Sequence, residues 1–517
     1  MKSVFFNNEV LEAEKNIISN LNIPSLVLME NAGMNSANFI YDVCKKENSD
    51  EIVILAGKGN NAGDGFVIAR HLSNLNIKSS VVLFYPESDL KGDALINFNV
   101  IKNIGDKIKI ISSDGLIDYL KTVLRLKLLF VDSVFGIGFK GELDGRIKNL
   151  FSEINKIKNK KVIAIDTVSG LKNYFDKDEY LNADFTLTMG IKKFNSVFDK
   201  GREVSGKIVV MNIGIEGEEF DRYNSRKIFE VESADFKNFI PKRGINSNKY
   251  TNGKLFVLAG SAGFTGASYL CSLASLKMGC GAVILGLPES LNPILESKTT
   301  EVITFPLEET EEKSLSGFAF QKIEEKIKWS NAVLIGPGIG RNPETLALVR
   351  RIVTECDVTA VLDADAIFAF KGYLELLKKQ DKKIILTPHY GEFSNLTGIK
   401  TEDIKNNIYE ISVEFARKYN IILVLKNSPT IVTDGDEFYI NSAGRENLAT
   451  IGSGDVLSGI IAGVLAQNKN PLKSALAGTY IHGRCGDILY EKTGPDSTIA
   501  SELISELQNV KKELLGF

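Results

Sequence analysis

Hydrophobic residues in the first half of the chain form short runs that alternate with longer stretches of mixed polarity. The run at 51–56 predicts a buried strand, and Phe66, Ala69 and Leu72 then recur at the spacing of one helix face. Further strands are predicted at 80–84, 128–131, 162–165 and 207–211. This alternation of strands and helices predicts an α/β fold, with a parallel sheet covered by helices on both faces.

The alternation starts again in the second half, after an acidic and irregular stretch at 214–219. A helix is expected from about 267 to 278, and a hairpin at 430–440 turns on Asp434-Gly435. Strands are predicted at 254–259, 282–285, 332–335, 360–362, 384–386 and 421–425. The halves share no obvious repeat, and 517 residues exceed one usual core. We therefore expect two different domains, 1–220 and 230–517, with the boundary between 215 and 235.

Charge and composition exclude several classes of protein. The formal net charge is −3 with both signs scattered, so nucleic acid is not an expected partner, and Lys192-Lys193 is expected to be a solvated face. The five cysteines have no CxxC spacing and are expected to be reduced thiols. No run approaches the roughly 20 apolar residues that span a bilayer, and Asn7, Asn8 and Glu9 interrupt any signal peptide. We expect a cytoplasmic protein that does not bind membranes.

The most informative motif is the segment 451–455, Ile-Gly-Ser-Gly-Asp, which leads into a predicted helix. Its glycines let backbone amides approach an anion closely, and the start of the helix presents its positive end there. Asp455 could accept a proton from a hydroxyl that attacks phosphorus, which is the chemistry of phosphoryl transfer. The alternative on this motif alone is that Asp455 is a helix N-cap and the glycines a tight turn.

Other loops at predicted strand ends favour the catalytic interpretation. They are the segments 260–266, 336–340, 362–366 and 387–392. Loops at the carboxyl ends of parallel strands line ligand crevices in α/β sheets. His389 alone is more typical of a hydrogen-bonded loop residue than of a ligand contact. Together, however, the loops predict one crevice that contains Asp455.

The first half also carries candidate chemistry at its strand ends. The Gly/Asn-rich segment 57–65 lies between a strand and a helix, where it suits a phosphate, although an unliganded loop is an equal alternative. Asp132 and Asp166 each end a hydrophobic run, where an acid alone is more typically structural. Side by side on a parallel sheet, they would place carboxylates in one crevice.

The second half resembles the ADP/ATP-dependent NAD(P)H-hydrate dehydratases, which have a ribokinase-like fold. The resemblance rests on the ordered set Gly-Ser-Ala-Gly-Phe-Thr-Gly-Ala at 260–267, Gly-Pro-Gly-Ile-Gly at 336–340, Thr-Pro-His-Tyr-Gly-Glu at 387–392 and Gly-Ser-Gly-Asp at 452–455. It covers residues 235–510 and implies that the hydroxyl of a hydrated nicotinamide ring is phosphorylated and then eliminated, which restores the dihydropyridine. ADP or ATP with Mg²⁺ would be the phosphoryl donor.

The resemblance assigns roles to individual residues. Asp455 would be the base, with Gly452, Ser453 and Gly454 as the anion hole. The hydrated dinucleotide would contact Ala267, Gly338, His389 and Asp455, and the adenine nucleotide would contact Lys426, Asn427, Ser428, Pro429, Thr430 and Gly454. The chain departs from the family at Asn427, where glycine is usual, and at 447–451, which the family makes richer in glycine and methionine.

The first half resembles the NAD(P)H-hydrate epimerase domain, a Rossmann-like three-layer α/β/α fold. The resemblance rests on the predicted helix near 29–33, the Gly-Asn-Asn-Ala-Gly-Asp-Gly loop at 59–65 and Ala-Ile-Asp-Thr-Val-Ser-Gly-Leu at 164–171. It implies that Asp166 is the acid/base and that K⁺ is held by Asn61, Asp132 and Ser169. The hydrate would contact Asn60, Asn61, Ala62, Gly63, Asp64, Gly136, Ile137, Gly138, Phe139, Lys140, Gly141, Glu142 and Asp166. Departures from the family are Ala62, Ile137 and Val168.

These resemblances together predict a bifunctional repair enzyme for hydrated nicotinamide cofactors. It would epimerise R- and S-NAD(P)HX and dehydrate the S form, with NADHX, NADPHX and ADP or ATP as small-molecule ligands and a homo-oligomer as the assembly. The alternative is a ribokinase-type small-molecule kinase, such as a hydroxymethylpyrimidine kinase, with an accessory Rossmann-like domain. That first domain could also merely bind a ligand or a partner protein.

Overall fold

The computed structural model describes residues 1–517 except 106, 124, 175–178, 358, 380–382 and 517. The chain divides into two compact units. The N-terminal unit comprises residues 3–225, and the C-terminal unit comprises residues 226–517 together with the first two residues. None of the predicted site residues lies among the undescribed positions. Within the described residues, no helix combines the length and the apolar character needed to cross a membrane.

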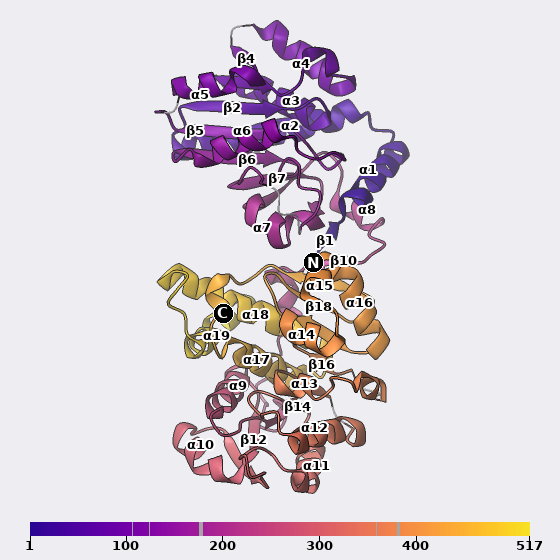
Figure 1. Ribbon diagram of the computed structural model, residues 1–517, viewed down its shortest axis with the longest axis vertical. Helices are drawn as coiled ribbons and strands as arrows, with labels where there is room; N and C mark the ends of the chain where they lie inside the picture. The colour runs from indigo at the N-terminus through magenta and orange to yellow at the C-terminus, as the bar shows by residue number, and fades with distance from the viewer. Residues whose placement is uncertain (106, 124, 175–178, 358, 380–382, 517) are drawn as a thin grey trace. The chain divides into compact units, whose positions relative to one another are not determined.

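The N-terminal unit is built around a seven-stranded parallel sheet in the order β4-β3-β2-β5-β6-β7-β9 (Figure 1). These strands are β2 (Glu51–Ala56), β3 (Ser79–Leu83), β4 (Ile108–Ser112), β5 (Leu128–Ser133), β6 (Lys160–Ile165), β7 (Phe185–Met189) and β9 (Lys207–Met211). The two-residue β8 (Lys192–Lys193) pairs with β1 (Lys2–Phe5). Because β2, β5 and β6 are neighbours, their carboxyl ends lie together at one edge.

Helices cover both faces of this sheet because its central strands are hydrophobic on both sides. Along β2, Ile52 and Ile54 belong to one core and Val53 and Leu55 to the other, as the alternation of side chains in a strand requires. The first core includes residues of α1 (Asn7–Leu21), α2 (Ser25–Glu47), α3 (Asn60–Asn74) and α4 (Gly92–Ile104). The second includes residues of α5 (Leu116–Val123) and α6 (Gly145–Lys156). The short helices are α7 (Asp199–Ser205) and α8 (Gly217–Asp221).

The C-terminal unit has its own sheet, in the order β13-β12-β11-β14-β15-β16-β17-β18-β19-β10. Its strands are β10 (Ile228–Glu230), β11 (Lys254–Leu258), β12 (Ala282–Pro288), β13 (Ile303–Leu307), β14 (Ala332–Ile335), β15 (Ala360–Leu362), β16 (Ile385–Leu386), β17 (Ile422–Leu425), β18 (Thr430–Thr433) and β19 (Phe438–Asn441). Pairing is parallel from β13 to β17, and β17, β18 and β19 pair antiparallel. The predicted hairpin is confirmed, with Gly435 at a φ of 93° in its turn.

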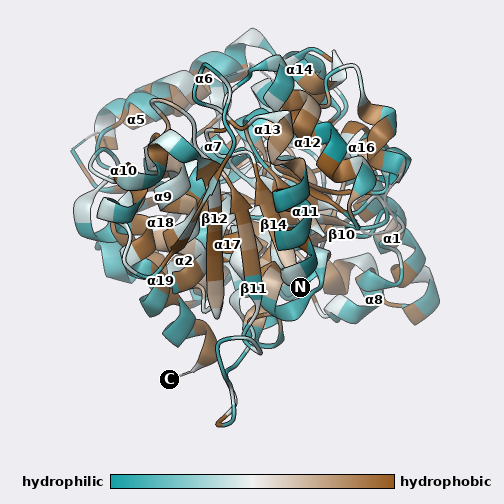
Figure 2. Cartoon of the chain, turned by 90° about the horizontal axis from the view of Figure 1, so that it is seen from below, coloured by the Kyte–Doolittle hydropathy of each residue, from teal (hydrophilic) through white to brown (hydrophobic). Residues whose placement is uncertain are grey.

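One core of this unit packs the sheet against α9 (Thr265–Lys277), α17 (Ser453–Asn468), α18 (Pro471–Thr493) and α19 (Ala500–Leu515). The remaining helices are α10 (Asn292–Lys298), α11 (Phe320–Trp329), α12 (Pro343–Glu355), α13 (Asp365–Phe368), α14 (Tyr390–Thr397), α15 (Thr401–Asn406) and α16 (Ile408–Tyr419). Figure 2 shows β12 and β14 as hydrophobic and α11 as largely hydrophilic, as expected for buried parallel strands beneath an outer helix. The predicted α/β class with parallel sheets is confirmed, and β1, β4, β7, β8, β10 and β13 are additional to the strands predicted from the sequence.

Candidate active sites

A cavity of about 680 Å³ opens at the carboxyl edge of the sheet in the N-terminal unit. The loops after β2 and β5, the end of β6 and part of α1 and α2 contribute to its walls. Among the predicted hydrate contacts, it is lined by Asn60, Asn61, Asp64, Gly136, Ile137, Gly138, Phe139, Lys140 and Asp166. Ala62 and Gly63 are buried in the first turn of α3, Gly141 and Glu142 are exposed, and the cavity lining does not include them.

Asp166 forms a buried ion pair with Lys193 in this cavity wall. The Lys193 ammonium lies 2.6 Å from Asp166 Oδ1 and also donates to the carbonyl of Met189 at 2.8 Å. The Lys193 side chain is completely buried, so the expectation that it belongs to a solvated face is wrong. Asp166 itself has a φ of 67°, a left-handed conformation that directs its carboxylate from the end of β6 toward the lysine.

Lys193 escaped prediction because β7 was not recognised in the sequence. Thr186, Leu187, Thr188 and Met189 are all buried in β7, which pairs with β6, and Lys193 follows the carboxyl end of that strand. The rule that led to Asp132 and Asp166, an ionisable residue after a buried strand, would therefore have found Lys193 as well.

Two further carboxyl groups lie near this ion pair. Burial raises the pKa of Glu14 to about 7, although the positive charge of Lys193 opposes the shift. Burial, with the negative charges of Asp166 and Glu14, also raises the pKa of Asp64 well above its usual range. Both groups line the cavity, and Glu14 was not predicted from the sequence. This site can therefore hold protonated carboxyl groups beside a carboxylate that is paired with a lysine.

The three residues predicted to hold K⁺ are all buried, and two of them, Asp132 and Ser169, contact each other. Asp132 is fully buried, and its oxygens accept from the hydroxyl of Ser169 at 2.5 Å and from the amide of Ser169 at 2.9 Å. Both amide atoms of Asn61 are buried and, within the described residues, lack a hydrogen-bond partner. Amide, hydroxyl and carboxylate oxygens are ligands that fit a hard monovalent cation, and the unsatisfied amide oxygen of Asn61 has room for such a partner. Burial raises the pKa of Asp132 to about 6.

Aromatic rings form part of the cavity mouth. Phe135 and Phe139 stack with centroids 4.1 Å apart, and Tyr85 meets Phe135 edge-on. The Lys58 ammonium lies 4.6 Å from the centroid of the Tyr85 ring. Together with exposed Lys140, these residues give the opening flat apolar surfaces and positive charge, which suit a phosphorylated ligand that carries planar rings.

In the C-terminal unit, the order β11-β14-β15-β16 places the predicted glycine-rich and acidic loops side by side. Gly338, at a φ of 63°, packs so closely that a Cβ there would lie 3.1 Å from that of Ala267. The structure therefore brings these two predicted contacts together. Gly452 has a φ of 87° and is the N-cap of α17, so the interpretation of Asp455 as the N-cap does not hold.

The start of α17 presents unsatisfied amides next to Asp455. Within the described residues, the amides of Gly454 and Asp455 donate to no protein acceptor. Burial and the negative charges of Asp363, Asp365 and Glu392 raise the pKa of Asp455 to about 7, and Lys426 opposes the shift. A carboxylate with this pKa can accept a proton near neutral pH, and the free amides can stabilise an anion beside it.

In the C-terminal unit, Lys426 forms a largely buried ion pair with Asp363. Its ammonium lies 2.9 Å from Asp363 Oδ1, which also accepts from the hydroxyl of Thr387 at 2.8 Å. Burial by itself lowers the pKa of Lys426, but Asp363, Glu392 and Asp455 together raise it. A Cβ at Gly454 would lie 3.4 Å from the Lys426 ammonium, so this cation reaches the start of α17. Asp363 and Thr387 lie in predicted loops but were not predicted as site residues.

The remaining predicted residues surround this cluster. His389 forms a backbone bridge to Lys426, and its Nδ1 accepts from the amides of Gly391 and Glu392. Its ring is thus an N-cap of α14 while remaining 58% exposed. Ser453 contacts the buried ring of His482 at 3.1 Å, and burial lowers the pKa of His482 to about 4. Asn427, Ser428 and Pro429 lie in the turn between β17 and β18, and Thr430 is the first residue of β18.

Comparisons with known proteins divide the chain in the same way. A family model described as NAD(P)H-hydrate dehydratase matches residues 255–509, and one described as YjeF-related protein N-terminus matches residues 25–194. The bifunctional NAD(P)H-hydrate repair enzyme of Moorella thermoacetica is 34% identical, and the match covers 95% of this chain and 93% of that protein. The enzyme of the same name from Dictyoglomus turgidum is 33% identical, with coverage of 97% and 96%.

A crystal structure of the ADP/ATP-dependent NAD(P)H-hydrate dehydratase from Bacillus subtilis, co-crystallised with ATP and Mg²⁺, also matches. It is 26% identical and gives a TM-score of 0.48, with coverage of 55% of this chain and 97% of that chain.

Proposed function

The chain belongs to the family of bifunctional NAD(P)H-hydrate repair enzymes, and we propose that it repairs hydrated nicotinamide cofactors with two separate active sites. The N-terminal unit would interconvert the R and S epimers of NAD(P)HX, and the C-terminal unit would dehydrate the S epimer in a nucleotide-dependent reaction. The family match does not favour the alternative of a ribokinase-type kinase with an accessory binding domain.

The observation that carries the dehydratase proposal is the Asp455 carboxyl at the start of α17, with its pKa raised to about 7 beside unsatisfied amides. Asp455 would take the proton of the ring hydroxyl as its oxygen attacks the terminal phosphorus of the nucleotide. The new phosphate ester would then leave as inorganic phosphate, and loss of a proton from the neighbouring ring carbon would restore the dihydropyridine. Phosphorylation is needed because hydroxide is a poor leaving group.

The groups around Asp455 suit the other needs of this step. The amides of Gly454 and Asp455 would bind the phosphoryl oxygens on which negative charge is concentrated. The Lys426 ammonium, held by Asp363, would lie against the polyphosphate. Mg²⁺ bound to the nucleotide would neutralise phosphate charge, with ADP or ATP as the donor. Gly338, Ala267 and the exposed ring of His389 would contact the hydrated dinucleotide.

In the N-terminal unit, we propose that Asp166 is the acid/base of epimerisation. The hydrated ring carbon bears both a hydroxyl and the ring nitrogen, so its configuration is lost when one of these bonds breaks and reforms. Asp166 would move the hydroxyl proton, and Lys193 would hold its carboxylate in place. The carboxyls of Glu14 and Asp64 are the nearby groups that can supply a proton.

We also propose that K⁺ binds at Asn61, Asp132 and Ser169 in this unit. The unpartnered buried Oδ1 of Asn61 supports the assignment, because a cation would satisfy it. Bound K⁺ would contribute fixed positive charge beside the phosphates of the ligand. The residues of the chain would still perform the proton transfers.

The test is to incubate the full-length protein with acid-generated NADHX and with ATP or ADP separately. We expect recovery of the dihydronicotinamide absorbance and release of one inorganic phosphate per molecule repaired. Complete consumption of a mixture of epimers, rather than of one epimer, would support the epimerase. A stable phosphorylated product without recovered dihydronicotinamide would instead support the kinase alternative.

A further inference from the structure

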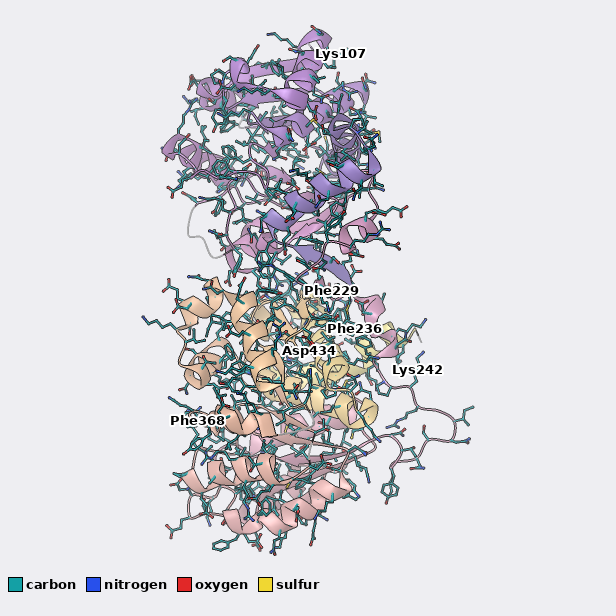
Figure 3. All side chains as sticks on the ribbon, turned by 90° about the vertical axis from the view of Figure 1, so that its right-hand side faces the viewer. Lys107, Phe229, Phe236, Lys242, Phe368 and Asp434 are labelled. Atoms are coloured by element: carbon teal, nitrogen blue, oxygen red, sulfur yellow. The ribbon has the colours of Figure 1, made fainter. Side chains whose placement is uncertain are left out.

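A groove of about 520 Å³ in the C-terminal unit lies away from the residues of the proposed active site. It is formed by the end of α9, the end of α17, α19 and the segment 241–243. Figure 3 labels Lys242 where the chain leaves the packed part of the unit. The lining of the groove includes no Asp or Glu, and five of its residues are cations, namely Lys242, Arg243, Lys277, Lys511 and Lys512.

Within the described residues, none of the five cations forms an ion pair with an acidic side chain. The acidic residues of α19 face elsewhere, since Glu506 pairs with Lys492 and Glu513 with Arg484. Helix α19 thus directs these two glutamates toward α18 and its lysines into the groove.

The cations are also crowded. Lys511 is partly buried, and burial together with the positive charge of Arg243 lowers its pKa. Its ammonium donates to the carbonyl of Met278 at 2.9 Å, and Arg243 donates to the carbonyl of Gly279 at 3.0 Å. These contacts explain why Lys511 and Arg243 lie at the end of α9, because a helix C-terminus carries partial negative charge. They do not explain Lys242, Lys277 or Lys512, for which no such bond is formed among the described residues.

The rest of the lining suits a small ligand rather than a macromolecule. Gln467 and Gln508 can donate and accept hydrogen bonds, and Leu276, Leu515 and Pro241 are apolar. The volume lies within the range of small-molecule sites, which is roughly 300–1,000 Å³.

From the concave shape and the uncompensated charge, we propose that this groove is a second anion site, which binds an oligophosphate group. The ligand would be a nucleoside di- or triphosphate or a free inorganic oligophosphate, whose charges would replace the missing carboxylates. The groove is distinct from the catalytic cluster because it lies at the other end of α17. Asp455 is in the first turn of that 16-residue helix, and Gln467 is at its end. The rise of an α-helix puts about 18 Å between them.

The test measures binding of inorganic tripolyphosphate to the full-length protein by calorimetry, with two sets of variants. Replacing Lys277 and Lys512 together by glutamine removes two exposed groove cations whose loss should leave the fold intact. We expect this double variant to bind the groove ligand roughly tenfold more weakly, since each lysine contributes Coulombic attraction in a solvated site. Lys426→Met, which alters only the catalytic cluster, should leave this binding event unchanged.

The matched control is Lys298→Gln, because Lys298 ends α10 as Lys277 ends α9 and is likewise exposed. It should bind as the unchanged protein does. Titration with ATP then identifies the source of the phosphate. Two ATP molecules per chain indicate that the groove takes a nucleotide, whereas one ATP molecule per chain, with tripolyphosphate still bound in the groove, indicates a free oligophosphate. Equal affinity of the double variant and the unchanged protein would overturn the proposal, as would loss of all tripolyphosphate binding in Lys426→Met. Neither outcome depends on whether the chain repairs NAD(P)HX.

Discussion

The two proposed catalytic carboxyls differ in the placement of the nearest lysine. In the N-terminal unit, Lys193 contacts Asp166 itself at 2.6 Å. In the C-terminal unit, Lys426 contacts Asp363 at 2.9 Å, and Asp455 forms no hydrogen bond through its carboxylate within the described residues. Both units thus use a buried ion pair, but only in the first does the pair include the proposed catalytic group.

This difference determines which carboxyl groups can carry a proton near neutral pH. In the C-terminal unit, the pKa of about 7 falls on Asp455, which is suited to remove a hydroxyl proton during phosphoryl transfer. In the N-terminal unit, the carboxyl group with a pKa of about 7 is that of Glu14, while Asp166 is paired with Lys193. An irreversible step needs one base, whereas a reversible epimerisation needs both a group that donates a proton and a group that accepts one. The two arrangements match these needs.

The most severe test of the comparison is Asp455→Asn. Because the amide cannot take the hydroxyl proton, we expect nucleotide-dependent dehydration to fall by a factor of about 10² to 10⁴. Exchange between the epimers should stay unchanged in the same chain, which provides an internal control for folding. Recovery of dihydronicotinamide absorbance reports the first activity, and chromatographic separation of the epimers reports the second. Turnover close to that of the unchanged protein would remove Asp455 from the role of base.

Lys193→Met tests the direct pair in the N-terminal unit. Removing one partner leaves the Asp166 charge buried and unpaired, so we expect a loss of about 3–5 kcal/mol in the free energy of unfolding of this unit. Epimer exchange should fall by about a hundredfold or more. The measurements are urea unfolding and the exchange rate, with dehydration of pure S-NADHX as the control.

The double variant Lys193→Met/Asp166→Asn separates stability from catalysis. With no buried charge left, its stability should largely return, since a neutral pair avoids the desolvation penalty. Its exchange rate should stay low, because both proposed groups are gone. Recovery of exchange together with stability would show that Asp166 and Lys193 have only a structural role.

His482 lies beneath the proposed anion hole and should make the stability of the C-terminal unit depend on pH. Its pKa is lowered from 6.5 to about 4 on folding, so the unfolded chain binds more protons between these values. The free energy of unfolding is therefore unaffected by protonation of His482 above pH 6.5 and decreases as the pH falls toward 4. The shift corresponds to roughly 3 kcal/mol. Because glutamine does not titrate, the urea midpoint of His482→Gln should fall less than that of the unchanged protein as the pH drops from 6.5 to 4. Parallel pH dependence of the two midpoints would contradict the prediction.

The smallest expected effect is a displaced pH profile in Lys426→Met. For the unchanged protein, kcat/KM for dehydration should fall as the pH drops through about 7 and Asp455 becomes protonated. The Lys426 charge lowers the pKa of Asp455, so its removal should move this acidic limb to higher pH. The variant should also have a higher KM for the nucleotide. Lys298→Met serves as the control lysine, and a raised KM with an unmoved limb would limit Lys426 to nucleotide binding.

Particular residues show how far sequence patterns reach in this protein. The loops after 254–259, 332–335, 360–362 and 384–386 were predicted from strand ends, and the sheet order brings them together. Lys193 was predicted to be solvated because a pair of lysines is usually exposed, yet it is fully buried against Asp166. Glu14 carried no motif at all, and only the packing of α1 against the cavity gives it a raised pKa.

The sequence alone determined what depends on local order, namely the alternation of strands and helices, the glycine-rich turns and the family to which they point. Hydrophobic periodicity and glycine conformation are properties of neighbouring residues, so they can be read along the chain. Only the tertiary structure decided which lysine meets which carboxylate, which carboxyls are desolvated and where five cations gather without an acid. These properties depend on distances across the fold, because Coulombic interaction and burial act through space rather than along the chain.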